Sequence, residues 1–130
     1  MSIRYLAVTV LSLVCASAAS AQSAAEPLAA GDKATTALNA TEALADYRAA
    51  FAADSNSEEA YWKASRELVD LGEYEPDKDK QKDFYAEAEK LAKRAVELKP
   101  NDPEAHCSVA RAVGRVALSL GKKERVRYAK

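Results

Sequence analysis

The stretch that most constrains the fold runs from Ala86 to Gly114 and is interrupted by Pro100 and Pro103. Before Pro100, apolar residues recur at steps of three and four, which predicts one buried face of an α-helix. Pro100 ends this helix because its ring cannot continue the hydrogen-bond ladder. Asp102 is placed to cap a second helix, with Pro103 in its first turn. The stretch therefore predicts two antiparallel helices joined by a tight turn.

Further helices are expected on both sides of this hairpin. Ser55 and Asn56 each precede a glutamate by three residues, the spacing of a helix-capping box, and Gly72 is expected to end the helix that follows. Asp77 or Asp79 is expected to cap a long helix. The predicted helices are Thr41–Asp54, Glu58–Leu71, a long helix ending at Leu98, and Asp102–Leu120.

The helix pairs repeat within the chain. Asn56–Gly72 aligns with Asn101–Ala117, so that the run Ser57–Trp62 lies over Asp102–Cys107. Internal repetition of this kind is typical of stacked arrays. The many alanines also favour helix over sheet. We therefore predict an all-α fold in which antiparallel helix hairpins stack as a short α-solenoid.

The first residues have the features of a secretory signal peptide. Arg4 supplies a positive charge, Tyr5–Val14 is apolar, and Ala19–Ala21 has the small-x-small form of a cleavage site. We therefore expect an exported protein, periplasmic or secreted. The alternative is a membrane anchor that is not cleaved, for which the apolar run is short.

These patterns divide the chain into four segments. The second is rich in alanine, serine and threonine, and a short helix is expected within it from about Asp32. The last is basic, and a tail for anionic partners is the alternative to a helix there. The segments are a signal peptide over 1–21, a flexible leader over 22–38, a helical repeat domain over 39–121, and the start of a truncated helix over 122–130.

Catalytic and metal-binding patterns are not found, so we predict no enzyme, no cofactor and no metal. His106 is the single histidine, and adjacent helical residues such as His106 and Cys107 point about 100° apart, which excludes a catalytic dyad. The net charge of −1 does not favour nucleic acid. Cys107 is the single cysteine after the predicted signal peptide; it is expected to be buried, with an intermolecular disulfide or a reactive thiol as the alternative.

The repeat resembles the tetratricopeptide repeat (TPR) family. Ala43, Tyr47 and Ala50 match the small and aromatic positions of its second helix, and Leu98–Ala105 matches its L-x-P-N-x-x-E-A turn. Tyr61 stands where the family's first helix opens on an aromatic residue. The middle repeat is longer than the usual length of about 34 residues, and the excess falls between 72 and 84.

A narrower resemblance is to the regulator of microtubule dynamics group and its bacterial relatives. It is carried by the runs AYWKASRELVDLGE, KRAVELKPNDPEAH and GKKERVRYAK. In that group the helix that begins near Lys122 continues into further repeats, so the resemblance implies that this chain is an N-terminal fragment. The predicted export signal fits a bacterial relative.

The TPR resemblance implies a binding scaffold, in which the first helices of successive repeats line a concave groove for a protein or peptide. Val69 would also face this groove, and Arg66 and Arg111 would hold equivalent places suited to carboxylates. Under the alternative interpretation, these arginines pair with Glu59, Glu67 or Asp70, and Trp62 belongs to the core. The candidate binding residues are Glu59, Trp62, Arg66, Glu104, Cys107, Arg111 and Arg115.

A second possible function is a structural one, in which exposed terminal helices stack with another copy to form a homo-oligomer. This hypothesis, like the repeat, predicts incomplete burial near the end of the chain. Val113, Ala117 and Leu120 are expected to be less covered than the apolar residues of Glu58–Leu71.

Overall fold

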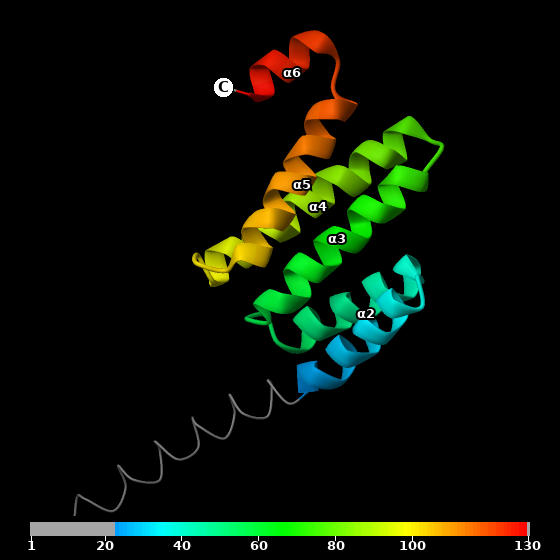
Figure 1. Cartoon of the computed structure of the whole chain (residues 1–130), viewed down its shortest axis with the longest axis vertical. Helices are drawn as coiled ribbons and strands as arrows, with labels where there is room; N and C mark the ends of the chain where they lie inside the picture. The colour runs from blue at the N-terminus through cyan, green and yellow to red at the C-terminus, as the bar shows by residue number, and fades with distance from the viewer. Residues whose placement is uncertain (1–22, 130) are drawn as a thin grey trace, which may run out of the picture.

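The computed structural model describes residues 23–129, and the regular structure within them is helical throughout (Figure 1). The all-α prediction is therefore confirmed. The predicted signal peptide lies outside the described residues. The helices are 23–36, α2 (Ala40–Ala53), α3 (Glu58–Tyr74), α4 (Lys78–Leu98), α5 (Pro103–Ser119) and α6 (Lys122–Tyr128).

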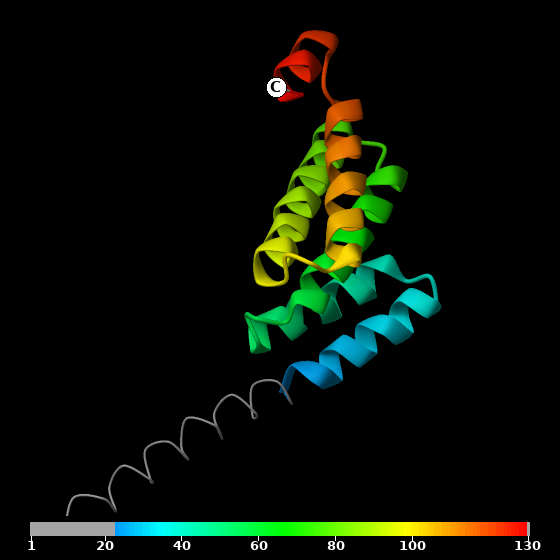
Figure 2. The ribbon, with the colours of Figure 1, turned by 60° about the vertical axis from the view of Figure 1, so that its left-hand side comes forward.

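Consecutive helices reverse direction and stack on one another, as expected for a helical solenoid. Figure 1 and Figure 2 both place 23–36 at one end of the stack and α6 at the other. α3 lies in the middle and packs against α2, α4 and α5. Leu68 and Val69 of α3 are fully buried there, with Tyr47 of α2 beside them in the core. The core thus sits where the hairpins meet.

For the segment 22–38 we predicted a flexible leader with a short helix from about Asp32; the helix is confirmed over 32–36, but it already begins at residue 23. Residues 23–36 are a helix whose Ala24 and Ala34 are buried, and Leu28 packs partly against the core. Gly31 leaves room for the ring of Tyr47, which lies directly against it. The small residues that we took as a sign of flexibility are those that allow this helix to approach α2 closely.

The predicted starts of the two later helices are confirmed. The Asp77 carboxylate accepts from the N–H groups of Asp79 and Lys80 at the start of α4. At the start of α5, the Asp102 carboxylate accepts from the N–H groups of Glu104 and Ala105, with Pro103 in the first turn. These carboxylates satisfy N–H groups that have no partner within their own helix.

Two predictions about α3 are wrong. Its N-cap is Ser57, which makes no side-chain capping bond, so neither Ser55 nor Asn56 forms the capping box that we expected. Gly72 does not end the helix, which continues to Tyr74. Gly72 is buried against the Tyr85 ring of α4, so its role is to permit a close approach between helices.

Burial falls toward the end of the chain, as predicted. Val113, Ala117 and Leu120 are only partly buried, whereas Leu68 and Val69 of α3 are fully buried. The most exposed large apolar side chain of α5 is Leu118, at 65%. Within 23–129, no helix combines the length and the apolar character that a membrane crossing requires.

Candidate functional site

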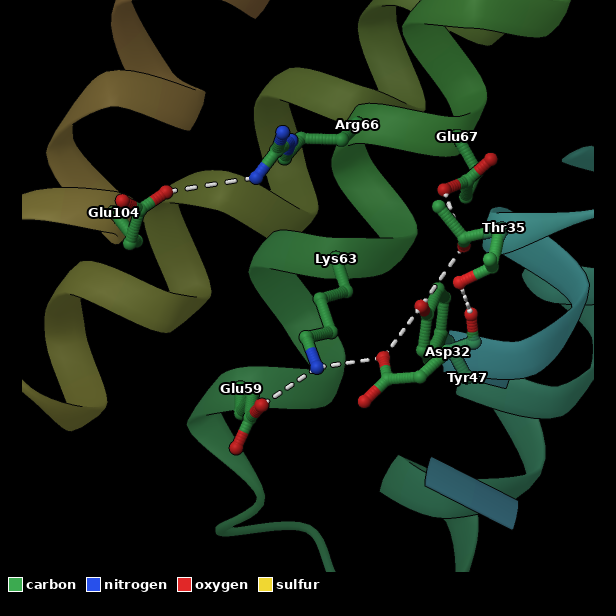
Figure 3. Close-up of polar contacts among 9 residues, drawn as sticks. Asp32, Thr35, Tyr47, Glu59, Lys63, Arg66, Glu67 and Glu104 are labelled. Carbon is green, nitrogen blue, oxygen red and sulfur yellow. Dashed lines mark hydrogen bonds and ion pairs between the residues drawn. The ribbon is translucent and has the colours of Figure 1, made fainter. Parts of the chain in front are cut away.

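A polar network joins the helix 23–36 to α2 and α3 (Figure 3). The Tyr47 ring is buried, and its hydroxyl donates to Oδ1 of Asp32 at 2.8 Å. Lys63 Nζ lies 2.6 Å from the same Asp32 oxygen and 2.6 Å from Oε1 of Glu59. The hydroxyl of Thr35 lies 3.0 Å from that of Tyr47. One ammonium group therefore bridges carboxylates from two helices.

The network changes the acidity of its members. Burial raises the pKa of Asp32, but the hydrogen bonds from Lys63 and Tyr47 outweigh it, and the pKa is lowered overall. Burial, together with the nearby Asp32 charge, raises the pKa of the Tyr47 hydroxyl far above its usual value. Burial lowers the pKa of Lys63, but the two carboxylates outweigh it and raise the pKa overall. Lys63 and Asp32 are therefore both charged near neutral pH and form an ion pair.

Glu67 is the buried carboxylate of this region, with 6% of its surface exposed. It accepts a hydrogen bond from the Thr35 hydroxyl at 2.8 Å. Burial raises the pKa of Glu67, and the nearby Asp70 charge adds to that rise, while the hydrogen bond from Thr35 and the charges of Arg66 and Arg111 act in the opposite direction. The carboxylate is thus held close to several charges, with a neutral hydroxyl as its hydrogen-bond donor.

A first hollow of about 290 Å³ opens between the helix 23–36 and α3. Trp62 lines it, and the Trp62 ring centroid lies 5.5 Å from Lys63 Nζ and 5.4 Å from Arg66 Cζ. Cations at this distance from an indole ring are attracted by its electron-rich face. The two basic side chains therefore hold Trp62 in place at the edge of the hollow.

A second, smaller hollow of about 190 Å³ opens between α3 and α5. Arg66 lines both hollows, so the two lie next to each other on either side of this side chain. Its guanidinium lies 3.5 Å from the Glu104 carboxylate, and both side chains are about half exposed. Ser108 also lines this hollow; its side chain is buried and its hydroxyl has no hydrogen-bond partner in the described part of the chain.

Two arginines of α5 are bound to acidic residues of α3. Arg111 forms an ion pair with Asp70 and lies 4.0 Å from Glu73. Arg115 pairs with Glu73. These contacts cross between the first helices of two successive hairpins, so they fix the spacing of α3 and α5.

The surface formed by 23–36, α3 and α5, with its two hollows, is called the groove surface below. Four of the seven candidate binding residues line the second hollow: Arg66, Glu104, Cys107 and Arg111. Trp62 lines the first hollow, Glu59 pairs with Lys63 beside it, and Arg115 lines neither. The structure thus brings most of the predicted residues onto one surface.

Three expectations about individual residues need correction. Val69 is fully buried in the core and does not face the groove surface. Cys107 is exposed, although we expected it to be buried. The alternative pairing of the arginines holds only for Arg111 with Asp70, because Arg66 pairs with Glu104 instead.

Sequence reasoning expected a helix only from about Asp32, and it missed both the start of this helix at residue 23 and the polar contacts of Asp32 and Thr35. A signal for them exists: a step back of about 34 residues from Ser65–Val69 leads to Gly31–Thr35. The buried Glu67 was considered only as a partner of arginine. Its burial depends on the helix 23–36, since Thr35 is its hydrogen-bond donor. No group of three or more possible metal ligands occurs within residues 23–129.

Comparison with known protein families gives a match over most of the chain. The family described as Regulator of microtubule dynamics protein 1-3 matches residues 23–130. The match begins at the helix 23–36, which we had predicted to be a leader, and so treats this helix as part of the domain. No curated protein matches the chain, and no solved structure matches it either.

Proposed function

This chain belongs to the family of regulator of microtubule dynamics proteins 1-3, and on that premise we propose that it is a non-enzymatic scaffold that binds an extended segment of a partner protein along its groove surface. The proposal places the partner across 23–36, α3 and α5. The resemblance of the repeats to the TPR family supports this choice of surface, since the first helix of each hairpin lines the groove there.

The observation that carries the proposal is that the two hollows are neighbours and share Arg66 as a lining residue. An extended segment needs a run of adjacent contacts. The two hollows offer the indole of Trp62 and the guanidinium groups of Arg66 and Arg111 as neighbouring contacts. Trp62 and Arg66 are residue types that often dominate binding energy at interfaces. The described residues therefore provide an anchor and charged contacts along one path.

The ion pair between Arg66 and Glu104 is suited to exchange. It is long, at 3.5 Å, and both partners are about half exposed, so it contributes little to stability. A carboxylate of the partner segment can replace Glu104 on Arg66 without exposing a buried charge. In the proposed complex, Arg66 and Arg111 contact acidic groups of the segment and Trp62 contacts an apolar one.

The test uses peptides selected from a random display library against the mature chain, and then measures their dissociation constants. Arg66→Ala combined with Arg111→Ala is expected to weaken binding by at least about tenfold, since each removes a charged contact. The matched control is Arg48→Ala, which removes a similarly exposed arginine that pairs with Glu87 away from the groove surface. Equal affinity of the double variant and the control would overturn the proposal.

A self-assembly role is the second candidate, and exposed apolar side chains near the end of the chain favour it. Leu118 is 65% exposed and Val126 is 58% exposed. Stacking of these side chains against another copy would remove them from water. Light scattering over a wide range of protein concentrations tests this role, and a monomer at the highest concentration would contradict it.

Export is the proposed location, because Met1–Ala21 has the form of a secretory signal. Fractionation of cells that express the full chain tests it. A processed protein outside the cytoplasm is expected, whereas full-length protein that stays with the membrane would favour the anchor.

A further inference from the structure

A third hollow, of about 610 Å³, lies between the turn that follows the helix 23–36 and the last turns of α3. It adjoins the first hollow, because Thr35, Glu67 and Asp70 line both. The carboxylates of Glu67, Asp70 and Glu73 line it, and no lysine or arginine does. We call it the acidic hollow.

Glu67 has no cation as a partner in this arrangement. Among the described residues it forms no ion pair within 4.0 Å, although Asp70 and Glu73 are paired with Arg111 and Arg115 of α5. Its hydrogen-bond donor is the neutral hydroxyl of Thr35. Figure 3 shows its second carboxylate oxygen directed away from Thr35, with no interaction drawn to it. A carboxylate taken out of water without a counter-ion is costly, and a cation that reaches it recovers much of that cost.

The rim of the acidic hollow is apolar and exposed. Leu38 is 93% exposed and Tyr74 is 88% exposed, more than the other large apolar side chains of the described chain. Leu38 also has a φ of 59°, in the left-handed region that a leucine rarely adopts. Two exposed apolar side chains therefore stand at the mouth of a hollow whose charged lining is acidic.

We propose that the acidic hollow receives one lysine or arginine side chain of the partner segment, which reaches the Glu67 carboxylate while a neighbouring aliphatic residue contacts Leu38 and Tyr74. Charge complementarity selects the basic residue, and the exposed rim selects its apolar neighbour. This inference rests on the proposed function, since it places a basic residue within the segment that crosses the groove surface. It adds a subsite specificity that the groove itself does not require.

The experiment uses the full chain at pH 7.5 and a defined probe, the peptide acetyl-Ser-Gly-Leu-Lys-Leu-Gly-Ser-amide. A matched peptide carries norleucine in place of the lysine, which keeps the four side-chain carbons and removes only the ammonium group. Amide chemical shifts of the isotope-labelled protein are followed as each peptide is added. We expect the lysine peptide to shift the amides of Leu38, Glu67 and Tyr74, and to bind at least about tenfold more tightly than the norleucine peptide.

Two variants test the contacts. Glu67→Gln keeps an oxygen that can accept from Thr35 and is expected to remove the preference for lysine. Tyr74→Ser, at an exposed position, is expected to weaken both peptides by a similar factor. The matched control is Glu87→Gln, a carboxylate of α4 that pairs with Arg48 and does not line the hollow. Circular dichroism of each variant establishes that it is folded.

Each other outcome overturns the inference. Equal binding of the two peptides, or a preference that survives Glu67→Gln, shows that Glu67 receives no cation. Shifts confined to Trp62 and Arg66 leave the groove proposal standing and remove the acidic hollow from it. Shifts that follow the protein concentration without peptide identify a second copy as the occupant. An absence of shifts also rejects the inference, while the groove proposal is judged separately by the selected peptides and the arginine variants.

Discussion

The ring of Tyr47 lies directly on the backbone of Gly31, so that a Cβ atom at Gly31 would come within 3.0 Å of the ring carbons. This contact joins the helix 23–36 to α2. The hydroxyl of the same ring donates to Asp32, one residue after the glycine. The first hairpin is therefore held by a close backbone approach and by a polar contact at the same place.

Gly31→Ala is expected to destabilise the protein by about 1–3 kcal/mol, because the added methyl group must displace a buried ring or the helix itself. Gly114→Ala is the matched control: it lies within α5, and a Cβ there meets nothing within 4 Å. Alanine is expected to stabilise that position by about 0.5–1 kcal/mol, since it favours the helix. Urea unfolding followed by circular dichroism measures both, and equal effects of the two variants would contradict the close contact.

Leu68→Ala is expected to cost about 2–5 kcal/mol of unfolding free energy, because the side chain is fully buried and its removal leaves a cavity. Leu118→Ala makes the same chemical change at a side chain that is 65% exposed. Its effect is expected to stay within about 0.5 kcal/mol. The comparison tests the fall in burial from α3 to α5. Unfolding of the two variants at similar urea concentrations would contradict this fall.

Tyr47→Phe is expected to destabilise the protein by about 1–2 kcal/mol, since it removes the hydroxyl that donates to the Asp32 carboxylate. It should also raise the pKa of Asp32, which that hydrogen bond helps to lower. Tyr74→Phe changes an exposed tyrosine and serves as the control. Unfolding experiments give the stability, and carbon NMR of the carboxyl groups gives the pKa. An unchanged Asp32 pKa would contradict the network.

Glu67→Gln is expected to make the protein more stable than wild type at neutral pH, and the difference should vanish in acid. Burial raises the pKa of Glu67 above its usual 4.5, so only between the unfolded and the folded pKa does the folded state hold a proton that the unfolded state has released, and above the folded pKa the buried carboxylate is ionised at a cost in stability. The contribution of Glu67 to the free energy of unfolding is therefore fully present below pH 4.5 and is lost as the pH rises through the folded pKa. Unfolding free energies at a series of pH values measure the difference. A glutamine variant that is less stable at neutral pH would show that Glu67 already has a counter-charge.

The starts of α4 and α5 were predictable because capping residues stand there in the sequence. Asp77 and Asp102 cap α4 and α5 as expected, and Pro103 lies in the first turn of α5. The helix 23–36 was recognised only from about Asp32, because the alanines and Gly31 before it resemble a flexible segment until the contact of Gly31 with the Tyr47 ring is known. Small residues do not indicate which side chains will pack against them, so the packing of the helix 23–36 against α2 could not be predicted from its own residues.

Part of the groove surface was predictable from the repeat. Arg66, Glu104, Cys107 and Arg111 come together as the repeat implied, since helical repeats place equivalent positions on one face. The contacts of Asp32 and Thr35, and the hydrogen bond to the buried Glu67, depend on the packing of the helix 23–36, which was not predicted. Val69 was misplaced because neighbouring positions on a helix differ by about 100°, and a small error in facing moves a residue from surface to core.

The groove proposal is tested most directly by hydrogen exchange of the full chain with and without a peptide selected for binding. The expected result is slower exchange in 23–36, α3 and α5, centred near Arg66, and unchanged exchange in α2 around Arg48. The Arg66→Ala and Arg111→Ala double variant should lose this protection at the same peptide concentration. Protection that appears on α2 and α4 instead, or that survives in the double variant, would contradict the claim that the groove surface binds the partner.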